Sequence, residues 1–166
     1  YSSIINEKNE INNEIKLLIL GGSQGAKLFD TKFKNSIINI SNRFKLNIYH
    51  QISSSNKKDL EDFYNQNNIN YRLFTFQENI LKFITSSNLC ITRAGASTLS
   101  ELTFLNIPYL AIPYPLAKDN HQLHNALYYK KKNCCWLLKQ EDLKNEALTK
   151  ILINIINNKE DYSVKK

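Results

Sequence analysis

The chain of 166 residues is poor in several residue types, and each shortage excludes a class of protein. Its three cysteines, Cys90, Cys134 and Cys135, are too few and too badly spaced for a disulfide framework or a zinc site, so we expect reduced thiols. No apolar run approaches the roughly 18 residues that a membrane-spanning helix needs. The first residues lack the basic and apolar regions of a signal peptide. Because there is no initiator Met, we interpret the chain as a piece of a longer protein.

The composition is that of one globular domain with a basic surface. Hydrophobic residues make up 42% and charged residues 22%, which is enough apolar material for a core. The net charge of +7 favours anionic partners. The one tight basic run, Lys130 to Lys132, is interpreted as a solvated helix end. No interleaved aromatic residues accompany it, so we expect no nucleic-acid partner.

Strand-like and helix-like segments alternate along the chain. We predict strands at 15–20, 45–51, 70–76, 88–92, 108–113 and 134–138. We predict helices at about 26–41, 56–67, 79–86, 96–106, 119–132 and 141–158. The alternation predicts an α/β, Rossmann-like, doubly wound parallel sheet of about six strands with helices on both faces. The domain is expected at 14–160, with a linker at 1–13 and a frayed tail at 161–166.

A glycine turn follows the first predicted strand and suits phosphate. Gly21, Gly22 and Gly25 frame Ser23 and Gln24, and we expect the next helix to begin near Ala26. The unpaired N–H groups of a helix N-terminus attract phosphate. The spacing is neither GxGxxG nor a P-loop, so a dinucleotide cofactor is disfavoured. A tight turn without a ligand remains the alternative.

A second turn of this kind follows the fourth predicted strand. Gly95 permits a ligand to approach the backbone closely, and Ser97 offers a hydroxyl at the helix start. Glu101 lies four residues after Ser97 on the same helical face, where its carboxylate could accept hydrogen bonds from a ribose diol. The alternative is a solvent-facing Glu101. Arg93 at the strand end could pair with a phosphate or with a nearby carboxylate, and the sequence leaves both open.

The loop after the fifth predicted strand leads into a helix that begins with clustered amides. Asp119 or Asn120 is a good N-cap for it. His121, Gln122 and Asn125 then share a helical face, and neutral amides suit sugar hydroxyls. No third ligand accompanies His121 and His124, no Asp-x-Asp pair is present, and no nucleophile–base constellation is found, so we expect neither a metal site nor a catalytic residue in this chain.

Taken together and in order, these elements resemble the C-terminal, donor-binding domain of the peptidoglycan N-acetylglucosaminyltransferases of glycosyltransferase family 28. The resemblance covers roughly residues 14–158. It is carried by Gly-Gly-Ser-Gln-Gly-Ala at 21–26, His50-Gln51, Phe76 and the residues after it, Arg93 to Glu101, Pro108 to Pro113, and Lys118 to Ala126. Two departures are Ile52-Ser53-Ser54, where the family usually has a nearby glycine, and Ser97, where it often has an apolar residue.

The resemblance implies one half of a two-domain GT-B enzyme, an inverting hexosyltransferase that moves N-acetylglucosamine from UDP-N-acetylglucosamine to lipid I and forms lipid II. It implies donor contacts at Ser23 (diphosphate), Gln77 (backbone to uracil), Ala96 and Ser97 (amides to phosphate), Glu101 (ribose), and His121, Gln122 and Asn125 (sugar). No tightly bound cofactor is implied. The family's N-terminal domain, which binds the lipid-linked acceptor and holds the expected base, is absent, so we expect this chain to be inactive alone.

The implied location is the cytoplasmic face of the inner membrane, as a peripheral protein. One alternative is a standalone donor-binding subunit that acts with a membrane subunit on a dolichol-linked acceptor. Another, from a different class, is a non-catalytic UDP-sugar-binding module.

Overall fold

A single six-stranded parallel sheet forms the centre of the molecule. The computed structural model describes residues 11, 14–75, 79–144 and 146–165. The strands run in the order β3-β2-β1-β4-β5-β6. Their bounds are β1 Glu14–Leu20, β2 Lys45–Gln51, β3 Asn70–Phe74, β4 Leu89–Thr92, β5 Tyr109–Ala111 and β6 Cys135–Leu137. All five pairings are parallel, so the predicted fold class is confirmed.

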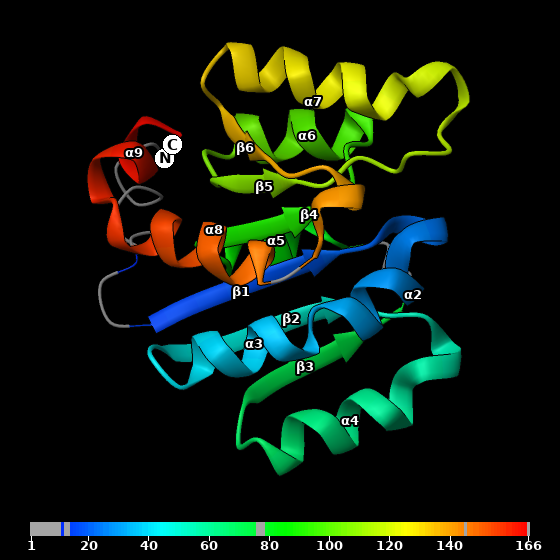
Figure 1. Ribbon diagram of the computed structural model, residues 1–166, viewed down its shortest axis with the longest axis vertical. Helices are drawn as coiled ribbons and strands as arrows, with labels where there is room; N and C mark the ends of the chain where they lie inside the picture. The colour runs from blue at the N-terminus through cyan, green and yellow to red at the C-terminus, as the bar shows by residue number, and fades with distance from the viewer. Residues whose placement is uncertain (1–10, 12–13, 76–78, 145, 166) are drawn as a thin grey trace.

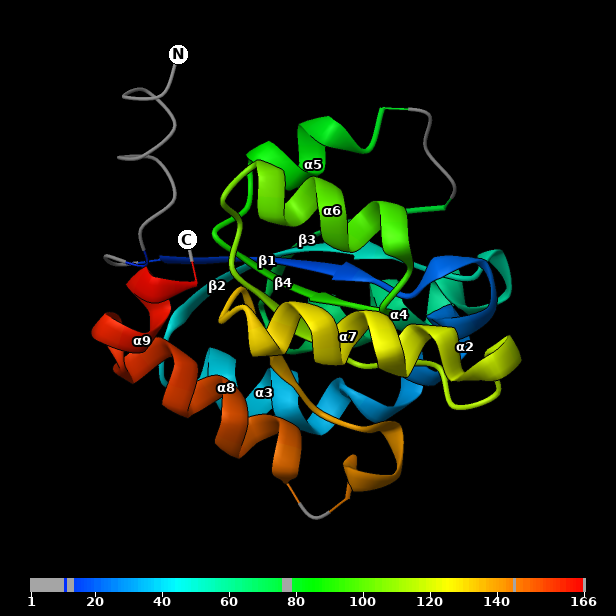
Figure 2. The ribbon, with the colours of Figure 1, turned by 90° about the horizontal axis from the view of Figure 1, so that it is seen from above.

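Helices cover both faces of the sheet, as Figures 1 and 2 show. Their bounds are α2 Gly22–Lys32, α3 Lys34–Ser41, α4 Lys57–Gln66, α5 Leu81–Thr85, α6 Ala96–Phe104, α7 His121–Lys131, α8 Ala147–Asn157 and α9 Lys159–Val164. Right-handed crossovers place α2, α3 and α4 on one face and α5, α6 and α7 on the other, and α8 packs into the core of the first face.

Alternate side chains of β1 point to opposite faces of the sheet, and the domain has one apolar core on each face. Ile15, Leu17 and Ile19 pack into the core under α2, α3, α4 and α8. Leu18 and Leu20 pack into the core under α5, α6 and α7. A strand buried on both faces must be apolar throughout, which explains the unbroken run at this position. The switch in strand order falls between β1 and β4, and ligands of such sheets bind at that point, outside the carboxyl ends of the strands.

Several predicted helix boundaries differ from the structure, and the helix predicted at 141–158 spans only Ala147–Asn157. The first helix starts at Gly22 rather than near Ala26, so Gly25 lies inside α2 and not in the turn. The predicted helix at 26–41 is two helices, because α2 and α3 meet at Phe33. The ring of Phe33 is fully buried and stacks on Phe29 at 4.4 Å, which holds the junction against the core.

The C-terminal segment is ordered where a frayed tail was expected at 161–166. It forms α9, in which Tyr162 is buried and donates a hydrogen bond to the carbonyl of Asn88. Asp161 also accepts hydrogen bonds from the Trp136 indole (2.7 Å) and the Lys165 ammonium (2.9 Å). These contacts could not be predicted from the polar sequence of the tail, because they are made with residues distant in the sequence. Of the predicted linker, residues 1–10 and 12–13 lie outside the described residues, and Ile11 packs against the core.

Candidate functional site

The turn between β4 and α6 exposes a helix N-terminus at the carboxyl edge of the sheet. Gly95 is the N-cap of α6, with extended backbone angles (φ −68°, ψ 137°) and no side chain to cap the helix. Ala96 and Ser97, the first two residues of the helix, are exposed. Their N–H groups are among those that no intrahelical carbonyl can satisfy. The structure thus places the two predicted phosphate-binding amides at an open helix end.

Two side chains of α7 hold this turn from the far side. The Gln122 side-chain oxygen accepts hydrogen bonds from the N–H groups of Ala94 (3.2 Å) and Tyr114 (2.9 Å). The Asn125 side-chain amide donates to the carbonyl of Ala94 at 3.1 Å. Gln122 and Asn125 therefore share one helical face, as predicted. Together they bind both the N–H and the carbonyl of Ala94. The contacts use one polar atom of each amide and join the β4 turn, the β5 exit and α7 into one unit.

His121 and Glu101 are more exposed than the two amides. The His121 ring nitrogen Nδ1 lies 2.7 Å from the carbonyl of Lys118, which directs the imidazole toward solvent. Asn120 is the N-cap of α7 in the left-handed region (φ 52°), and its side chain makes no capping hydrogen bond. Glu101 and Ser97 are both exposed on α6, as their spacing predicts. No partner of the Glu101 carboxylate is found among the described residues.

The turn between β1 and α2 is shorter than predicted, because α2 already begins at Gly22. Gly22 adopts φ +65°, a conformation that glycine reaches without a Cβ penalty. The side-chain oxygen of Gln51, at the end of β2, accepts the Gly22 N–H at 3.1 Å. Gln51 thereby ties the turn to the neighbouring strand. Ser23 lies in the first turn of α2, and its side chain is outside the described residues, as is Gln77, for which a uracil contact was implied.

Arg93 pairs with no carboxylate among the described residues, so of the two predicted partners only a phosphate remains a prediction. Its guanidinium donates to the carbonyls of Ile112 and Pro113, each at 3.2 Å, and to the side-chain oxygen of Gln140 at 2.7 Å. The group also lies over the ring of Phe29, at 4.6 Å from the centroid. The side chain is 6% exposed, and burial lowers its pKa to about 10, so it stays charged at neutral pH. Arg93 therefore joins the end of β4 to the segment after β5 and to Gln140, beneath the proposed site.

A buried polar cluster behind the glycine turn was not predicted. His50 and Asp30 are fully buried, with 3.4 Å between His50 Nε2 and Asp30 Oδ1. His50 Nδ1 lies 2.9 Å from the Tyr64 hydroxyl. The other Asp30 oxygen accepts the Asn56 amide at 2.9 Å. Burial lowers the pKa of His50 to about 3 and raises the pKa of Asp30.

These residues are far apart in the sequence, so spacing offered no signal for the cluster. The sequence hints were the His50-Gln51 motif and a carboxylate at position 30, within an otherwise apolar helical face that includes Phe29 and Phe33.

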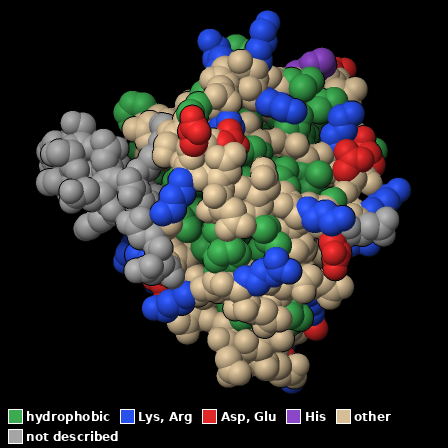
Figure 3. Space-filling model, turned by 60° about the vertical axis from the view of Figure 1, so that its left-hand side comes forward, with side chains coloured by type: hydrophobic (Ala, Val, Ile, Leu, Met, Phe, Trp, Pro, Cys, Tyr) green, Lys and Arg blue, Asp and Glu red, His purple; other side chains and the backbone are tan. Residues whose placement is uncertain are grey.

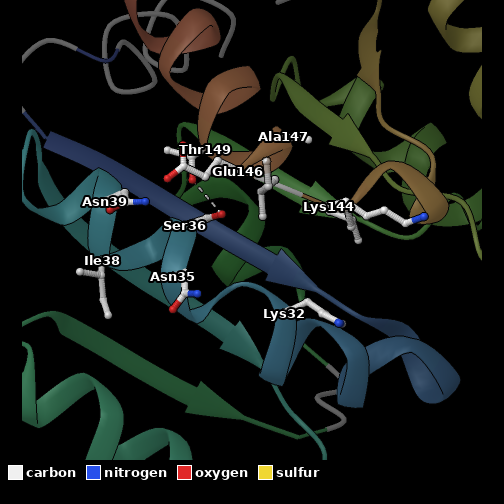
Figure 4. A pocket seen from close by; sticks show the side chains of 11 residues that line it. Lys32, Asn35, Ser36, Ile38, Asn39, Lys144, Glu146, Ala147 and Thr149 are labelled. Carbon is white, nitrogen blue, oxygen red and sulfur yellow. Dashed lines mark hydrogen bonds between the residues drawn. The ribbon is translucent and has the colours of Figure 1, made fainter.

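Two hollows on the described surface have none of the donor-binding residues predicted on α6 and α7 in their linings. The larger, of about 470 Å³, opens between α3 and the start of α8 (Figure 4). It is lined by polar groups such as Asn35 and Asn39, with Lys32 and Lys144 beside it, and Ser36 and Thr149 bond to each other at its base. The smaller, of about 230 Å³, borders the carboxyl end of β3 at Arg72 and Phe74.

The chemistry at the carboxyl edge is that of binding. It offers the N-termini of α2 and α6, the amide side chains of Gln122 and Asn125, and the exposed carboxylate of Glu101. Over the described ranges, no three metal-ligating side chains converge. In the same part of the chain, no helix has both the length and the apolar character needed to cross a bilayer.

Comparison with known proteins gives one consistent result. The family model "Glycosyltransferase family 28 C-terminal domain" matches residues 16–166. A UDP-N-acetylglucosamine–N-acetylmuramyl-(pentapeptide) pyrophosphoryl-undecaprenol N-acetylglucosamine transferase of Pelagibacter ubique is 51% identical over 158 residues, which is 95% of this chain and 44% of the relative. The protein of the same name from Rickettsia bellii is 37% identical and is covered over 45% of its length.

Solved structures agree with the sequence relatives. The crystal structure of Acinetobacter baumannii MurG matches with a TM-score of 0.82 at 24% identity, over 96% of this chain and 47% of that one. At this level of identity the match shows the fold. The chain spans a little under half the length of the proteins it matches.

Proposed function

Because the chain belongs to glycosyltransferase family 28, whose C-terminal domain model spans residues 16–166, we propose that it is the donor-binding half of an inverting N-acetylglucosaminyltransferase. The proposed donor is UDP-N-acetylglucosamine and the proposed acceptor is lipid I, so that the product is lipid II of peptidoglycan synthesis. The name shared by the Pelagibacter and Rickettsia relatives supports this reading over the dolichol-linked alternative.

One observation carries the proposal: an uncapped helix N-terminus and an exposed carboxylate lie on the same short helix. The amides of Ala96 and Ser97 suit the donor diphosphate, since a helix N-terminus carries unpaired N–H donors and partial positive charge. Glu101 follows just over one turn later, at a distance that suits a ribose joined to that diphosphate. We assign Glu101 to the ribose hydroxyls and His121, Gln122 and Asn125 to the sugar.

The Gln122 and Asn125 amides fit this assignment in a specific way. Gln122 uses its oxygen on the two backbone N–H groups and so has its amide NH₂ left to donate. Asn125 uses its NH₂ on the Ala94 carbonyl and so has its oxygen left to accept. One donor and one acceptor on the same helical face match the mixed character of sugar hydroxyls. The fold thus sets the direction in which each amide addresses the ligand.

Catalysis needs more than this chain supplies. In the proposed enzyme, the helix N-termini stabilise negative charge that develops on the UDP leaving group as the glycosidic bond breaks. A general base and an acceptor site are also needed, and we assign both to the other half of the enzyme. We place the whole enzyme at the cytoplasmic membrane surface, where its lipid-linked acceptor resides.

Calorimetric titration of this chain with UDP-N-acetylglucosamine, UDP-glucose and UDP-galactose tests the proposal. We expect binding of uridine nucleotides, with preference for the N-acetylated sugar. Absence of binding by all three would overturn the donor assignment. A transfer assay with the full-length protein and a lipid-linked acceptor then separates an enzyme from a non-catalytic UDP-sugar-binding module.

A further inference from the structure

The first turn of α2 begins with two glycines and has no side-chain cap. Gly21 is the N-cap, and Gly22, the first helical residue, adopts φ +65° beside open space. Glycine has more backbone freedom than any other residue, so neither glycine fixes the direction of its own N–H group. The orientation of this helix N-terminus therefore depends on a contact from elsewhere.

Gln51, the last residue of β2, supplies that contact. Its side-chain oxygen accepts the Gly22 N–H at 3.1 Å. The backbone of Gln51 is held on both sides, because it pairs with Leu20 of β1 and with Phe74 of β3. The Ile52 N–H extends the second pairing by donating to the Phe74 carbonyl at 2.8 Å. A rigid strand end thus carries the acceptor that orients the glycine.

The strand residue before Gln51 holds the same helix further along. His50 Nε2 lies 3.4 Å from Asp30 Oδ1, and Asp30 lies in α2, just over two turns beyond its start. The other Asp30 oxygen accepts the Asn56 amide at 2.9 Å and joins the helix to the segment after β2. Adjacent residues of β2 therefore fix both the body of α2 and its first N–H group.

The second glycine turn is held in a different way. Gln122 accepts the N–H of Ala94, which lies two residues before the start of α6 at Ala96. Gln51 instead accepts the N–H of the first residue of α2 itself. It therefore acts directly on the row of N–H groups that a phosphate would meet at a helix N-terminus.

We infer that Gln51 is a positioning residue of the donor site. It fixes the Gly22 peptide so that the N–H groups that follow in the first turn of α2 face the donor diphosphate. The inference rests on the proposed function, because a diphosphate must bind at this turn. The role needs no contact between Gln51 and the reacting atoms.

A neutral acceptor suits this role. A carboxylate would accept the same N–H but would bring a negative charge next to the diphosphate. An aliphatic side chain would leave the N–H without an acceptor to orient it. Of these three kinds of side chain, only the amide orients the turn without repelling the ligand.

Surface charge would give a phosphate a less specific site. Figure 3 shows basic side chains dispersed among acidic ones over one side of the molecule. Directed N–H groups fix both the position and the orientation of a phosphate. A test of the turn should therefore change the acceptor and leave the net charge as it is.

A rival role for Gln51 has the opposite sign. If its oxygen only occupied the Gly22 N–H until a ligand arrived, phosphate would displace it, because a charged oxygen is the stronger acceptor. Removing the amide would then strengthen binding. The positive φ of Gly22 favours the positioning role, because a residue with this freedom needs a restraint before a ligand can use the turn.

Titration of the Gln51→Met variant with UDP and with uridine tests the inference. Methionine keeps the length of the side chain and removes the acceptor. We expect UDP to bind about fivefold more weakly, as for the loss of one neutral hydrogen bond, and uridine to bind as it does to the unchanged chain. Calorimetry measures the UDP affinity and NMR titration the uridine affinity. A purely structural role would weaken both ligands alike.

The Gln51→Glu variant supplies a rescue experiment. It restores the acceptor but adds a charge near the diphosphate, so UDP should bind weakly at low salt. As salt screens that charge, its UDP affinity should approach that of the unchanged chain at the same salt, whereas Gln51→Met should show no such recovery. Equal weakness of both variants at high salt would show that the acceptor does not position the turn. The hydrogen bond lies at the surface, so both variants should fold, and thermal unfolding checks this.

The matched control is Gln66→Met, which makes the same change at an exposed position at the end of α4. It should leave both affinities unchanged. The inference is overturned if Gln51→Met binds UDP as tightly as the unchanged chain or more tightly, if it loses uridine to the same extent, or if the control loses UDP equally. An unchanged chain that binds neither ligand would instead refute the donor assignment, and the positioning role with it.

Discussion

The side-chain oxygen of Gln122 accepts a hydrogen bond from the main-chain N–H of Ala94, at 3.2 Å, across the gap between α7 and the β4 turn. The same oxygen accepts the N–H of Tyr114 at 2.9 Å. One atom therefore satisfies two donors from two different strand exits. Such an acceptor cannot be removed without leaving both donors unpaired.

We predict that Gln122→Leu destabilises the domain by about 2 kcal/mol, because each unpaired and partly buried N–H costs about 1 to 3 kcal/mol before solvent relieves it. Urea denaturation followed by circular dichroism measures the change. Gln122→Glu keeps the acceptor and should recover most of the loss. Equal destabilisation by both variants would show that the amide oxygen does not hold the turn.

Glu101 gives the sharpest test of the donor site. We predict that Glu101→Ala weakens binding of UDP-N-acetylglucosamine by about 1 to 3 kcal/mol, or roughly 5- to 150-fold, because a charged acceptor of the ribose hydroxyls is removed. The side chain is exposed, so stability should change little. Isothermal titration calorimetry measures the affinity.

Glu160 provides the matched control for this substitution. It is also an exposed glutamate on a helix, but it lies in α9, away from the carboxyl edge of the sheet. Glu160→Ala should leave donor affinity unchanged. If Glu101→Ala behaves like Glu160→Ala, Glu101 is a solvent-facing residue and the ribose assignment is wrong.

The glycines of the two turns, Gly22 and Gly95, lead to opposite predictions for the effect of alanine on stability. Gly22→Ala should destabilise the fold by about 1 kcal/mol through its positive φ, since the space around it is open. At Gly95 the φ is ordinary and an added Cβ would meet only the Thr98 hydroxyl, at 4.0 Å. Gly95→Ala should therefore change stability by no more than about 0.5 kcal/mol.

Donor affinity, unlike stability, should be sensitive to the substitution at Gly95. A methyl group beside the uncapped α6 N-terminus occupies space that the proposed diphosphate needs, so we expect about tenfold weaker binding. Thermal unfolding and calorimetric titration of both variants measure the two effects. A Gly95→Ala protein that binds the donor normally would show that no ligand approaches this backbone.

His50 predicts a pH dependence of stability. Burial lowers its pKa from 6.5 to about 3, so the unfolded chain binds a proton that the folded chain does not across that interval. The free energy of unfolding should therefore be fully present above pH 6.5 and fall as the pH drops toward 3, by up to about 1.4 kcal/mol per pH unit. The raised pKa of the facing Asp30 opposes part of this loss.

The His50→Gln variant isolates this contribution. Its free energy of unfolding, measured by urea denaturation between about pH 4 and pH 7, should fall less steeply than that of the unchanged chain. Parallel slopes would mean that the imidazole is protonated in the folded protein.

Most of the architecture could be predicted because the relevant signals are local. The six strands are short apolar runs between helical patterns, and the structure contains all six near the predicted positions. Gln122 and Asn125 were also expected on one face, because helical periodicity fixes that relation. The membership in family 28 likewise follows from short ordered motifs.

Other features depend on distant contacts and had no local signal. Arg93 finds its acceptors at Ile112, Pro113 and Gln140, none of which its sequence neighbours suggest. The polar tail becomes α9 because Tyr162 and Asp161 meet residues near β4 and β6. Helix capping signals were absent between α2 and α3, so the break at Phe33 could not be located.

Arg93 has a consequence for how an anion reaches this domain. Its buried guanidinium is held by neutral carbonyls, an amide and aromatic rings, and no carboxylate pairs with it in the described part of the chain. The positive charge beneath the two turns is therefore left uncancelled by the fold. A diphosphate approaching the sheet edge enters that field before it makes any contact, so higher ionic strength should slow its association.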